Sequence, residues 1–256
     1  MCDIYTNYTN YIDSFVDTDI QTWNFKSNPY YCGILEHVSE AQGNEYLFHV
    51  RNQFDYIYES NKDKLIDLCQ KNDHYGQTNK CVFDNFAYCS PSNLRYILHS
   101  CLILSHMVTC RLNDINIVEI GGGYGGLCFF IYNLAPLFKL HIKSYSIFDL
   151  QNPMRLQKKY LENLDICNVN FLDLFTFSSL NKNSYLISNY AFSEISMELQ
   201  KKYTERVLNP YISHGFLSWN YIEVYDFIEN KYIHHETEYP LTGEYNRYVR
   251  FQPLKN

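Results

Sequence analysis

Clusters of basic residues are missing from this 256-residue chain. No run of Lys and Arg is longer than two residues, as at Lys158-Lys159 and Lys201-Lys202, and the formal net charge is -7. Proteins that bind nucleic acid or anionic membranes electrostatically depend on clustered Lys and Arg. The composition therefore argues against nucleic acid and against a membrane surface as partners.

Patterned cysteines and targeting segments are missing as well. The nine cysteines form no C-x-x-C pair and no metal-ligand spacing, and their number is odd. We interpret them as free thiols in a reducing compartment and expect a cytoplasmic location. Residues 1–5 lack the basic and apolar regions of a secretory signal. The longest apolar segment, 94–112, contains two arginines and two histidines, which predicts a buried helix rather than a membrane span.

Glycine is scarce, and half of it lies in one place. The chain has ten glycines, five of them within residues 121–126. A β-branched run at 117–120 precedes them and an apolar run at 127–131 follows, which predicts a buried strand, a tight turn and a helix. Glycine permits positive φ and close approach of a ligand, and the start of the helix offers unpaired amides. The turn therefore predicts a site for a small polar ligand.

The glycine spacing fits two classes of cofactor. Gly121-x-Gly123-x-x-Gly126 fits the dinucleotide fingerprint, and Gly121-x-Gly123-x-Gly125 fits the looser pattern of S-adenosylmethionine (SAM) enzymes. Glu119 favours SAM, because a carboxylate repels a pyrophosphate but attracts the ammonium and sulfonium groups of SAM. We predict SAM as cofactor and S-adenosylhomocysteine as product. The predicted contacts in this stretch are Glu119, Gly121, Gly122, Gly123, Tyr124 and Gly125.

Strand and helix patterns alternate after residue 116, and this alternation predicts an α/β fold. The expected sheet is mostly parallel and doubly wound, ends in an antiparallel hairpin, and binds its ligand at the carboxyl ends of the strands. The expected strands are 117–120, 142–148, 169–172, 185–188 and 216–221, the helices are 126–134, 154–164 and 197–208, and the hairpin is 232–251.

The first 90 residues have weaker periodicity. They predict a mostly helical cap, with a helix over 55–69 and a loop over 72–79. Ser90 and Pro91 are typical of a helix start, here of a long helix that continues to about residue 112. We therefore predict a cap at 1–90 and a cofactor-binding core at 91–256.

Acidic residues follow two of the expected strands. Asp149 lies 28 residues after Gly121 (149 − 121), near where dinucleotide folds place the acid that binds ribose hydroxyls, and we predict this contact for Asp149 together with Leu150. The alternative is an Asp that only starts the turn before Pro153. Asp173 follows the third strand, and we predict that it contacts the adenine amino group.

The loop 188–195 follows the fourth strand, where cofactor and acceptor substrate meet in such folds. Asn189 and Tyr190 are predicted cofactor contacts, while Asn189, Ser193 and Glu194 are predicted to bind the acceptor. Glu194 is the predicted general base. The alternative is that Ser193 and Glu194 cap the next helix.

His234 and His235 are the competing candidates for the base. Adjacent strand residues face opposite sides, so at most one of the two points into a site and the pair cannot chelate one ion. No carboxylate cluster indicates a metal site, and the need for a divalent metal stays open.

Three segments carry a family resemblance: EIGGGYGGL, YSIFDL and LISNYAFSEIS. Together they resemble the sugar O-methyltransferase family, which belongs to the Rossmann-like class I SAM-dependent methyltransferases. Residues 92–96 are similar to the helix ahead of the first strand in that family, which makes Arg95 a candidate substrate contact, and 238–242 with Asn246 are similar to its terminal hairpin. The resemblance spans about residues 90–253, and Gln151 departs from it where the family tends to have Pro.

The resemblance implies a SAM-dependent O-methyltransferase that acts on a sugar hydroxyl, with a nucleotide-linked or glycan-precursor sugar as substrate. Three alternatives stay open: a methyltransferase of a non-sugar small molecule, a nicotinamide oxidoreductase, and a non-catalytic Rossmann-like module that binds a protein partner through its N-terminal cap. The particular sugar, the hydroxyl and assembly as a homo-oligomer are left open.

Overall fold

A computed structural model describes residues 2–254, with side chains from residue 5 onward. The chain forms two compact units that are not divided at a single position. The first unit contains the residues up to Leu102 together with 123–137 and 151–167, and the second contains 103–122, 138–150 and the residues from Asn168 onward.

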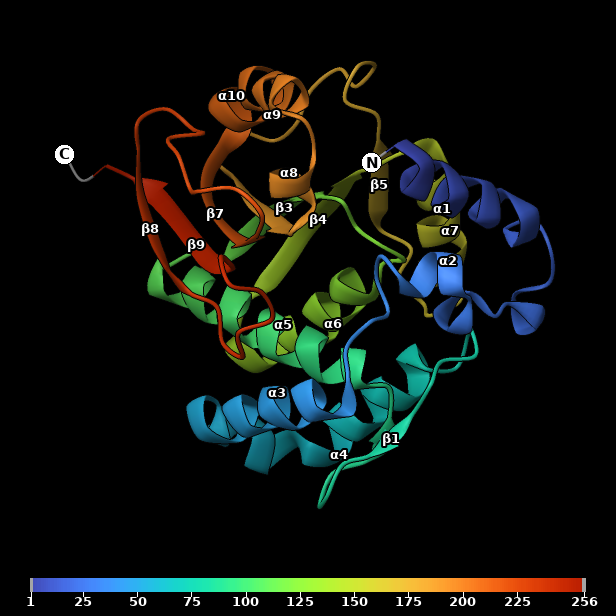
Figure 1. Ribbon diagram of the computed structural model, residues 1–256. Helices are drawn as coiled ribbons and strands as arrows, with labels where there is room; N and C mark the ends of the chain where they lie inside the picture. The colour runs from blue at the N-terminus through green and yellow to red at the C-terminus, as the bar shows by residue number, and fades with distance from the viewer. Residues whose placement is uncertain (1, 255–256) are drawn as a thin grey trace. The chain divides into compact units, whose positions relative to one another are not determined.

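A seven-stranded sheet forms the second unit, in the order β5-β4-β3-β6-β7-β9-β8 (Figure 1). The pairs among β3 to β7 are parallel, and β9 is antiparallel to both of its neighbours, β7 and β8. This confirms the predicted mixed α/β fold with a mostly parallel sheet and a terminal hairpin. The strands are β3 Asp114–Ile120, β4 His141–Phe148, β5 Val169–Leu172, β6 Ser184–Asn189, β7 Ile212–Trp219, β8 Lys231–Thr237 and β9 Arg247–Pro253.

The strand order reverses between β3 and β6. From β3 the chain adds β4 and β5 on one side, and it then returns to place β6 on the other side. Parallel strands end at the same edge of a sheet, and in open α/β sheets ligands bind outside the carboxyl ends at such a switch point. The topology therefore directs attention to the loops that follow β3, β4 and β6.

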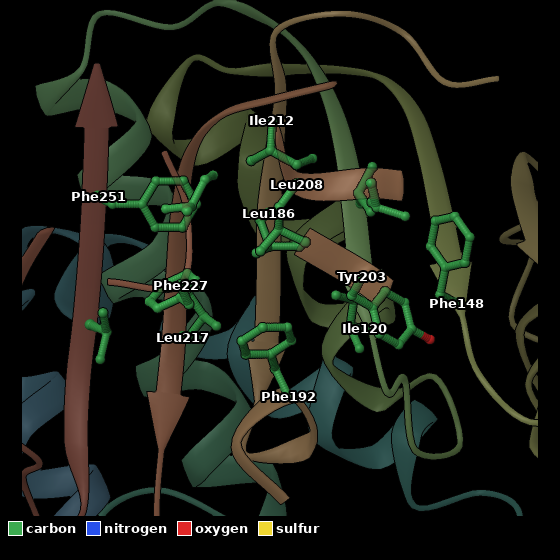
Figure 2. Packing of buried hydrophobic residues seen from close by; sticks show 14 of the residues in the cluster. Ile120, Phe148, Leu186, Phe192, Tyr203, Leu208, Ile212, Leu217, Phe227 and Phe251 are labelled. Atoms are coloured by element: carbon green, nitrogen blue, oxygen red, sulfur yellow. The ribbon is translucent and has the colours of Figure 1, made fainter. Parts of the chain in front are cut away.

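An apolar cluster covers one face of this sheet (Figure 2). Ile120, Leu186 and Leu217 come from neighbouring strands, and strand alternation brings them to the same face. Full burial of one such side chain stabilises the fold by roughly 1.5–3 kcal/mol. Helical residues that pack against them include Phe192 of α8 (Ala191–Glu194), Tyr203 of α9 (Met197–Tyr203) and Val207 and Leu208 of the π-helical segment Thr204–Leu208.

Helices dominate the first unit. A short hairpin of β1 (Cys81–Val82) and β2 (Tyr88–Cys89) was not predicted. The described cysteines, from Cys32 to Cys167, form no disulfide bond. The helices are α1 Cys2–Phe15, η1 Ile20–Thr22, η2 Phe25–Ser27, α2 Pro29–Cys32, α3 Glu40–Gln53, α4 Asp55–Asn72, α6 Gly126–Leu134 and α7 Gln151–Glu162. Two further helices cross the division between the units: α5 Pro91–Thr109 and η3 Ala135–Phe138.

Several predicted boundaries were wrong, each for a local reason. The long helix α5 ends at Thr109 rather than near residue 112, because Arg111 has a φ of +56°. Helix α7 begins at Gln151 rather than Met154, since Pro153 is tolerated in the first turn of a helix. The helix from Met197 does not stop before Pro210 but passes through the π-helical segment into α10 (Asn209–Tyr211), where the proline lies in the first turn.

Strand β7 runs from Ile212 to Trp219 rather than from 216 to 221. Its end is fixed by Tyr221, which is exposed and has a φ of +59°. Among the helices that the structure describes, none combines the length and apolar character needed to cross a membrane.

Candidate functional site

The glycine turn begins where β3 ends. Ser188 of β6 donates a hydrogen bond from its hydroxyl to the Ile120 carbonyl (2.8 Å), and the Gly121 amide donates to the Phe148 carbonyl of β4 (2.9 Å). Gly121 has a φ of +77°, and a Cβ built on it would lie 2.1 Å from the Cβ of Ala191. Glycine is therefore required at this position by its backbone conformation and by the close approach of α8.

Asp149 lies directly against this turn. One of its carboxylate oxygens accepts the Gly122 amide (3.0 Å), and the other accepts its neighbour, the Leu150 amide (2.8 Å). Asp149 is half-buried and the Leu150 side chain is exposed. The structure thus brings together the glycine turn after β3 and the acid after β4, as the prediction of a shared cofactor site requires. A contact of either residue with the ribose stays a prediction.

Glu119 is buried in the sheet, with only 1% of its surface exposed. The Tyr145 hydroxyl donates to its carboxyl group (2.9 Å). Burial raises the pKa of Glu119 to about 8, the hydrogen bond from Tyr145 opposes that rise, and the nearby charge of Asp149 adds to it. A cation bound close to Glu119 would favour its ionised form.

Asp173 has a local structural contact. Its carboxylate accepts the amides of Phe175 (2.8 Å) and Thr176 (3.0 Å) in the turn after β5, and it is exposed. An Asp that accepts amides two and three residues ahead is typical of such turns. Its predicted contact with the adenine amino group stays a prediction.

Polar groups are tied together in the loop after β6. The Ser193 hydroxyl is 2.6 Å from the Asn220 side-chain oxygen, and the Asn220 amide group donates to Glu194 (2.6 Å). The Ser218 hydroxyl donates to the side chain of Asn189 (3.1 Å). The residue that caps α9 is Ser196, so the capping alternative for Ser193 and Glu194 does not describe this helix.

The terminal hairpin contacts the same loop through the carboxylate of Glu238 rather than through His234 or His235. His234 and His235 are exposed on β8, the outermost strand. Glu238, one residue beyond β8, is 2% exposed and accepts a hydrogen bond from the Tyr190 hydroxyl. Glu238 and Asn220 were not among the predicted site residues. The polar spacing Glu238, Thr242, Asn246 was the available signal.

The remaining predicted site residues belong to the first unit. Arg95 is 7% exposed and donates to the Leu35 carbonyl (3.0 Å). The Tyr124 ring is fully buried and its hydroxyl accepts the Asn72 side-chain amide (2.9 Å), so only its backbone is available at the turn. Gly123 and Gly125 have φ of +58° and +97°. Arg95, Gly123, Tyr124 and Gly125 thus belong to the first unit, whereas Asn189, Ser193 and Glu194 belong to the second.

The carboxyl edge of the sheet is acidic. Carboxyl groups lie at or just beyond the ends of five strands, namely Glu119 on β3, Asp149 after β4, Asp173 after β5, Glu194 after β6 and Glu238 after β8. The ionised members of this set disfavour a pyrophosphate and favour cations and hydroxyl groups, and a bound cation would also favour the ionised form of Glu119. Within the part of the chain that the structure describes, no three or more His, Cys, Asp or Glu side chains gather as ligands for a metal ion.

Comparisons with known proteins give similarity in structure but not in sequence. No protein-family model matches the chain. No curated protein matches it in sequence. One similar solved structure is PKMT2 from Rickettsia typhi in complex with AdoHcy, at 24% identity over 42% of this chain and a TM-score of 0.33; the match spans only 21% of PKMT2.

Two further solved structures cover more of their own length. A mutant of MtNAS has 13% identity over 99% of this chain and 98% of its own, with a TM-score of 0.45. The N-methyltransferase NodS from Bradyrhizobium japonicum has 13% identity over 61% of this chain and 95% of its own, with a TM-score of 0.43. The functional assignment therefore has to come from the residues of this chain.

Proposed function

We propose that this protein is a SAM-dependent methyltransferase. The observation that carries the proposal is the hydrogen bond from the Gly122 amide to the Asp149 carboxylate, at the edge where β3, β4 and β6 end. It joins a glycine turn, which lets a ligand approach the backbone, to an acid suited to a pair of ribose hydroxyls. An adenosine-containing cofactor fits both features.

The charge of the edge favours SAM over a nicotinamide dinucleotide. A pyrophosphate at the turn would face Asp149, with the buried Glu119 on the preceding strand. The sulfonium and ammonium groups of SAM would be attracted by the same carboxyl groups. When bound, SAM supplies an electrophilic methyl group, and the protein's task is to place an acceptor atom in line with it.

A sugar hydroxyl is the proposed acceptor, and the transfer is an O-methylation. The loop after β6 offers hydroxyl, amide and carboxylate groups in one place, through Ser193, Asn220 and Glu194. Such a set can bind several hydroxyl groups of one polyol. The SNYAFSE segment, which resembles sugar O-methyltransferases, lies in this loop. Glu194 is the general base predicted from the sequence. The second candidate function is methylation of a non-sugar small molecule.

Thermal unfolding with SAM, S-adenosylhomocysteine, NAD and NADP tests the cofactor. A ligand that binds only the native state at 100 times its Kd stabilises it by about 2.7 kcal/mol. SAM and S-adenosylhomocysteine should raise Tm, and the two dinucleotides should not. A response to NAD or NADP alone would favour the oxidoreductase, and no response to any of the four would favour the non-catalytic module.

Asp149→Ala should weaken the binding of S-adenosylhomocysteine, because hydrogen bonds to a charged group contribute roughly 1.5–3 kcal/mol, or about 10- to 150-fold in Kd. Calorimetric titration measures this loss. Asp226→Ala is the matched control, since Asp226 is an exposed acid of the same unit. Equal affinity of the two variants would remove Asp149 from the cofactor site.

Transfer of a radiolabelled methyl group from SAM to a panel of acceptors tests the substrate. UDP-glucose, GDP-mannose and free monosaccharides represent sugars, and catechol and glycine represent other small molecules. Labelling of a sugar hydroxyl supports the proposal. Labelling confined to catechol or glycine supports the second candidate.

A further inference from the structure

Tyr190 occupies an unusual position at the carboxyl end of β6. It has a φ of +66° and a ψ of -33°, and its amide donates to the Ser218 carbonyl of β7 (2.8 Å). Such a backbone conformation costs a non-glycine residue of order 1–3 kcal/mol, and residues of this kind cluster at functional sites. Its ring is half-buried, and its hydroxyl donates to Glu238. The fold therefore holds one phenol group at the switch-point strand, paired with a carboxylate.

Glu238 is held in place from its other side. The carboxylate oxygen that does not face Tyr190 accepts the Thr242 amide (3.0 Å), the Thr242 hydroxyl (2.5 Å) and the Asn246 side-chain amide (3.0 Å). A nearly buried carboxylate with this many donors is fixed in orientation. Its remaining oxygen is directed at the phenol.

Strand register places Glu238 and Tyr190 at the same edge of the sheet and the two histidines short of that edge. Thr237 of β8 is level with Arg247, which is level with Trp219 of β7, and Ser218 of β7 is level with Asn189 of β6. Glu238 and Tyr190 therefore both follow the ends of their strands at one edge. His235 is level with Leu217 and Ser188, and its strand lies three strand spacings from β6, or roughly 14 Å.

We propose, on the basis of the proposed methyltransferase function, that Tyr190 is the catalytic residue that contacts the acceptor hydroxyl and that Glu238 receives the proton through it. In the transfer, the bond between sulfur and methyl breaks and its electron pair stays on sulfur, while the acceptor oxygen forms the new bond to the methyl carbon. The acceptor proton passes to the Tyr190 oxygen as the phenol proton passes to Glu238. A sulfonium and a carboxylate become a thioether and a carboxylic acid, so charge is conserved.

Substitution of either member should remove this proton transfer. Tyr190→Phe and Glu238→Gln should each lower single-turnover methylation of the acceptor found in the panel by roughly 10²–10⁴-fold, the usual contribution of general base catalysis. The double variant should be no slower than either single variant, because the two residues act as one unit. Binding of S-adenosylhomocysteine should change far less than the rate, because Tyr190→Phe keeps the backbone and the ring at the predicted cofactor contact.

Matched controls separate catalysis from structure. Tyr221→Phe removes a phenol hydroxyl from another tyrosine with positive φ, and Glu229→Gln neutralises an exposed acid; neither should alter the rate. Glu238→Gln can keep its side-chain oxygen toward Thr242 and Asn246. If Glu238→Gln does not fold, Tyr190→Phe still tests the proposal, because it leaves the contacts of Glu238 with Thr242 and Asn246 intact. Full methylation activity of folded Tyr190→Phe overturns the proposal. A loss of methylation rate in Glu194→Gln, with no loss in Tyr190→Phe or Glu238→Gln, overturns it as well.

An acceptor-independent measurement tests the position of Tyr190. NMR spectra of the protein with tyrosine 13C-labelled at ring Cζ are recorded with SAM and with S-adenosylhomocysteine, and Tyr190→Phe assigns the resonance. SAM and S-adenosylhomocysteine differ by one methyl group and one positive charge, so the Tyr190 resonance should shift differently with each. If both ligands bind and the resonance does not respond, this inference fails while the proposed function stands. If neither ligand raises Tm, both fail.

Discussion

Gly121→Ala should destabilise the protein far more than the same change at Gly123. Both glycines have positive φ, +77° and +58°, so each alanine acquires backbone strain. At Gly121 the new Cβ would also lie 2.1 Å from the Cβ of Ala191, whereas at Gly123 the nearest atoms are Leu35 methyl groups at 3.6 Å. The pair therefore separates the cost of the backbone conformation from the cost of the clash.

The magnitude follows from these two terms. A left-handed conformation costs an L-residue roughly 1–2 kcal/mol. Methyl groups in contact lie about 3.5–4.0 Å apart, so the turn or the start of α8 must move, and overpacking typically costs about 1–3 kcal/mol. We expect Gly121→Ala to lose roughly 2–5 kcal/mol and Gly123→Ala roughly 1–2 kcal/mol.

Chemical denaturation of the ligand-free protein measures these losses, and a second-site change identifies the clash. Ala191→Gly removes the methyl group that the Cβ introduced by Gly121→Ala would meet, so combining the two changes should recover the packing part of the loss. A double-mutant cycle should give a coupling energy of about 1–3 kcal/mol. Equal stability of the two single alanine variants, or strict additivity in the cycle, would refute the contact between the turn and α8.

Three further outcomes are expected. Gly123→Val should leave a folded protein that has lost binding of S-adenosylhomocysteine in calorimetry, because a branched side chain occupies the ligand's approach to the turn; retained binding would contradict the site. Burial raises the pKa of Glu119 from 4.5 to about 8, so the folded state holds an extra proton between these two pH values. The free energy of unfolding of the ligand-free protein should therefore fall as pH rises through this range, and denaturation curves of Glu119→Gln should lack this pH dependence. Burial lowers the pKa of Lys26 from 10.5 to about 8, so the folded state holds fewer protons than the unfolded state between these pH values. The free energy of unfolding should therefore rise with pH in this range, and the same pH dependence in Lys26→Met would exclude Lys26 as its source.

Local sequence patterns were enough to place most of the sheet. The run at 117–120 and the segment 169–172 are dense in apolar and β-branched residues, and they form β3 and β5. Alternation of such runs with helical segments predicted the parallel sheet, and the glycines at 121–126 predicted the turn after β3. These signals are short-range, because strand propensity, turn chemistry and burial pattern all depend on neighbouring residues.

The ends of helices and strands were harder to predict where the same residue type can either begin or end an element. Proline ends some helices and begins others, and here Pro153 and Pro210 lie in first turns. Positive φ at Arg111 and Tyr221 ended elements that apolar content alone would have extended. No residue-type preference predicts such a conformation for an arginine or a tyrosine.

The alternating fold, the glycine turn and the acids at the strand ends could be predicted from residues that lie close together in the chain. Which polar groups meet could not, because it depends on the packing of distant segments. The Gly122 amide meets Asp149 across 27 residues, and the Tyr190 hydroxyl meets Glu238 across 48. The first contact depends on the register of β3 and β4, and the second depends on the register of β6, β7, β9 and β8. A shift of one residue in either register would turn the strand side chains to the opposite face.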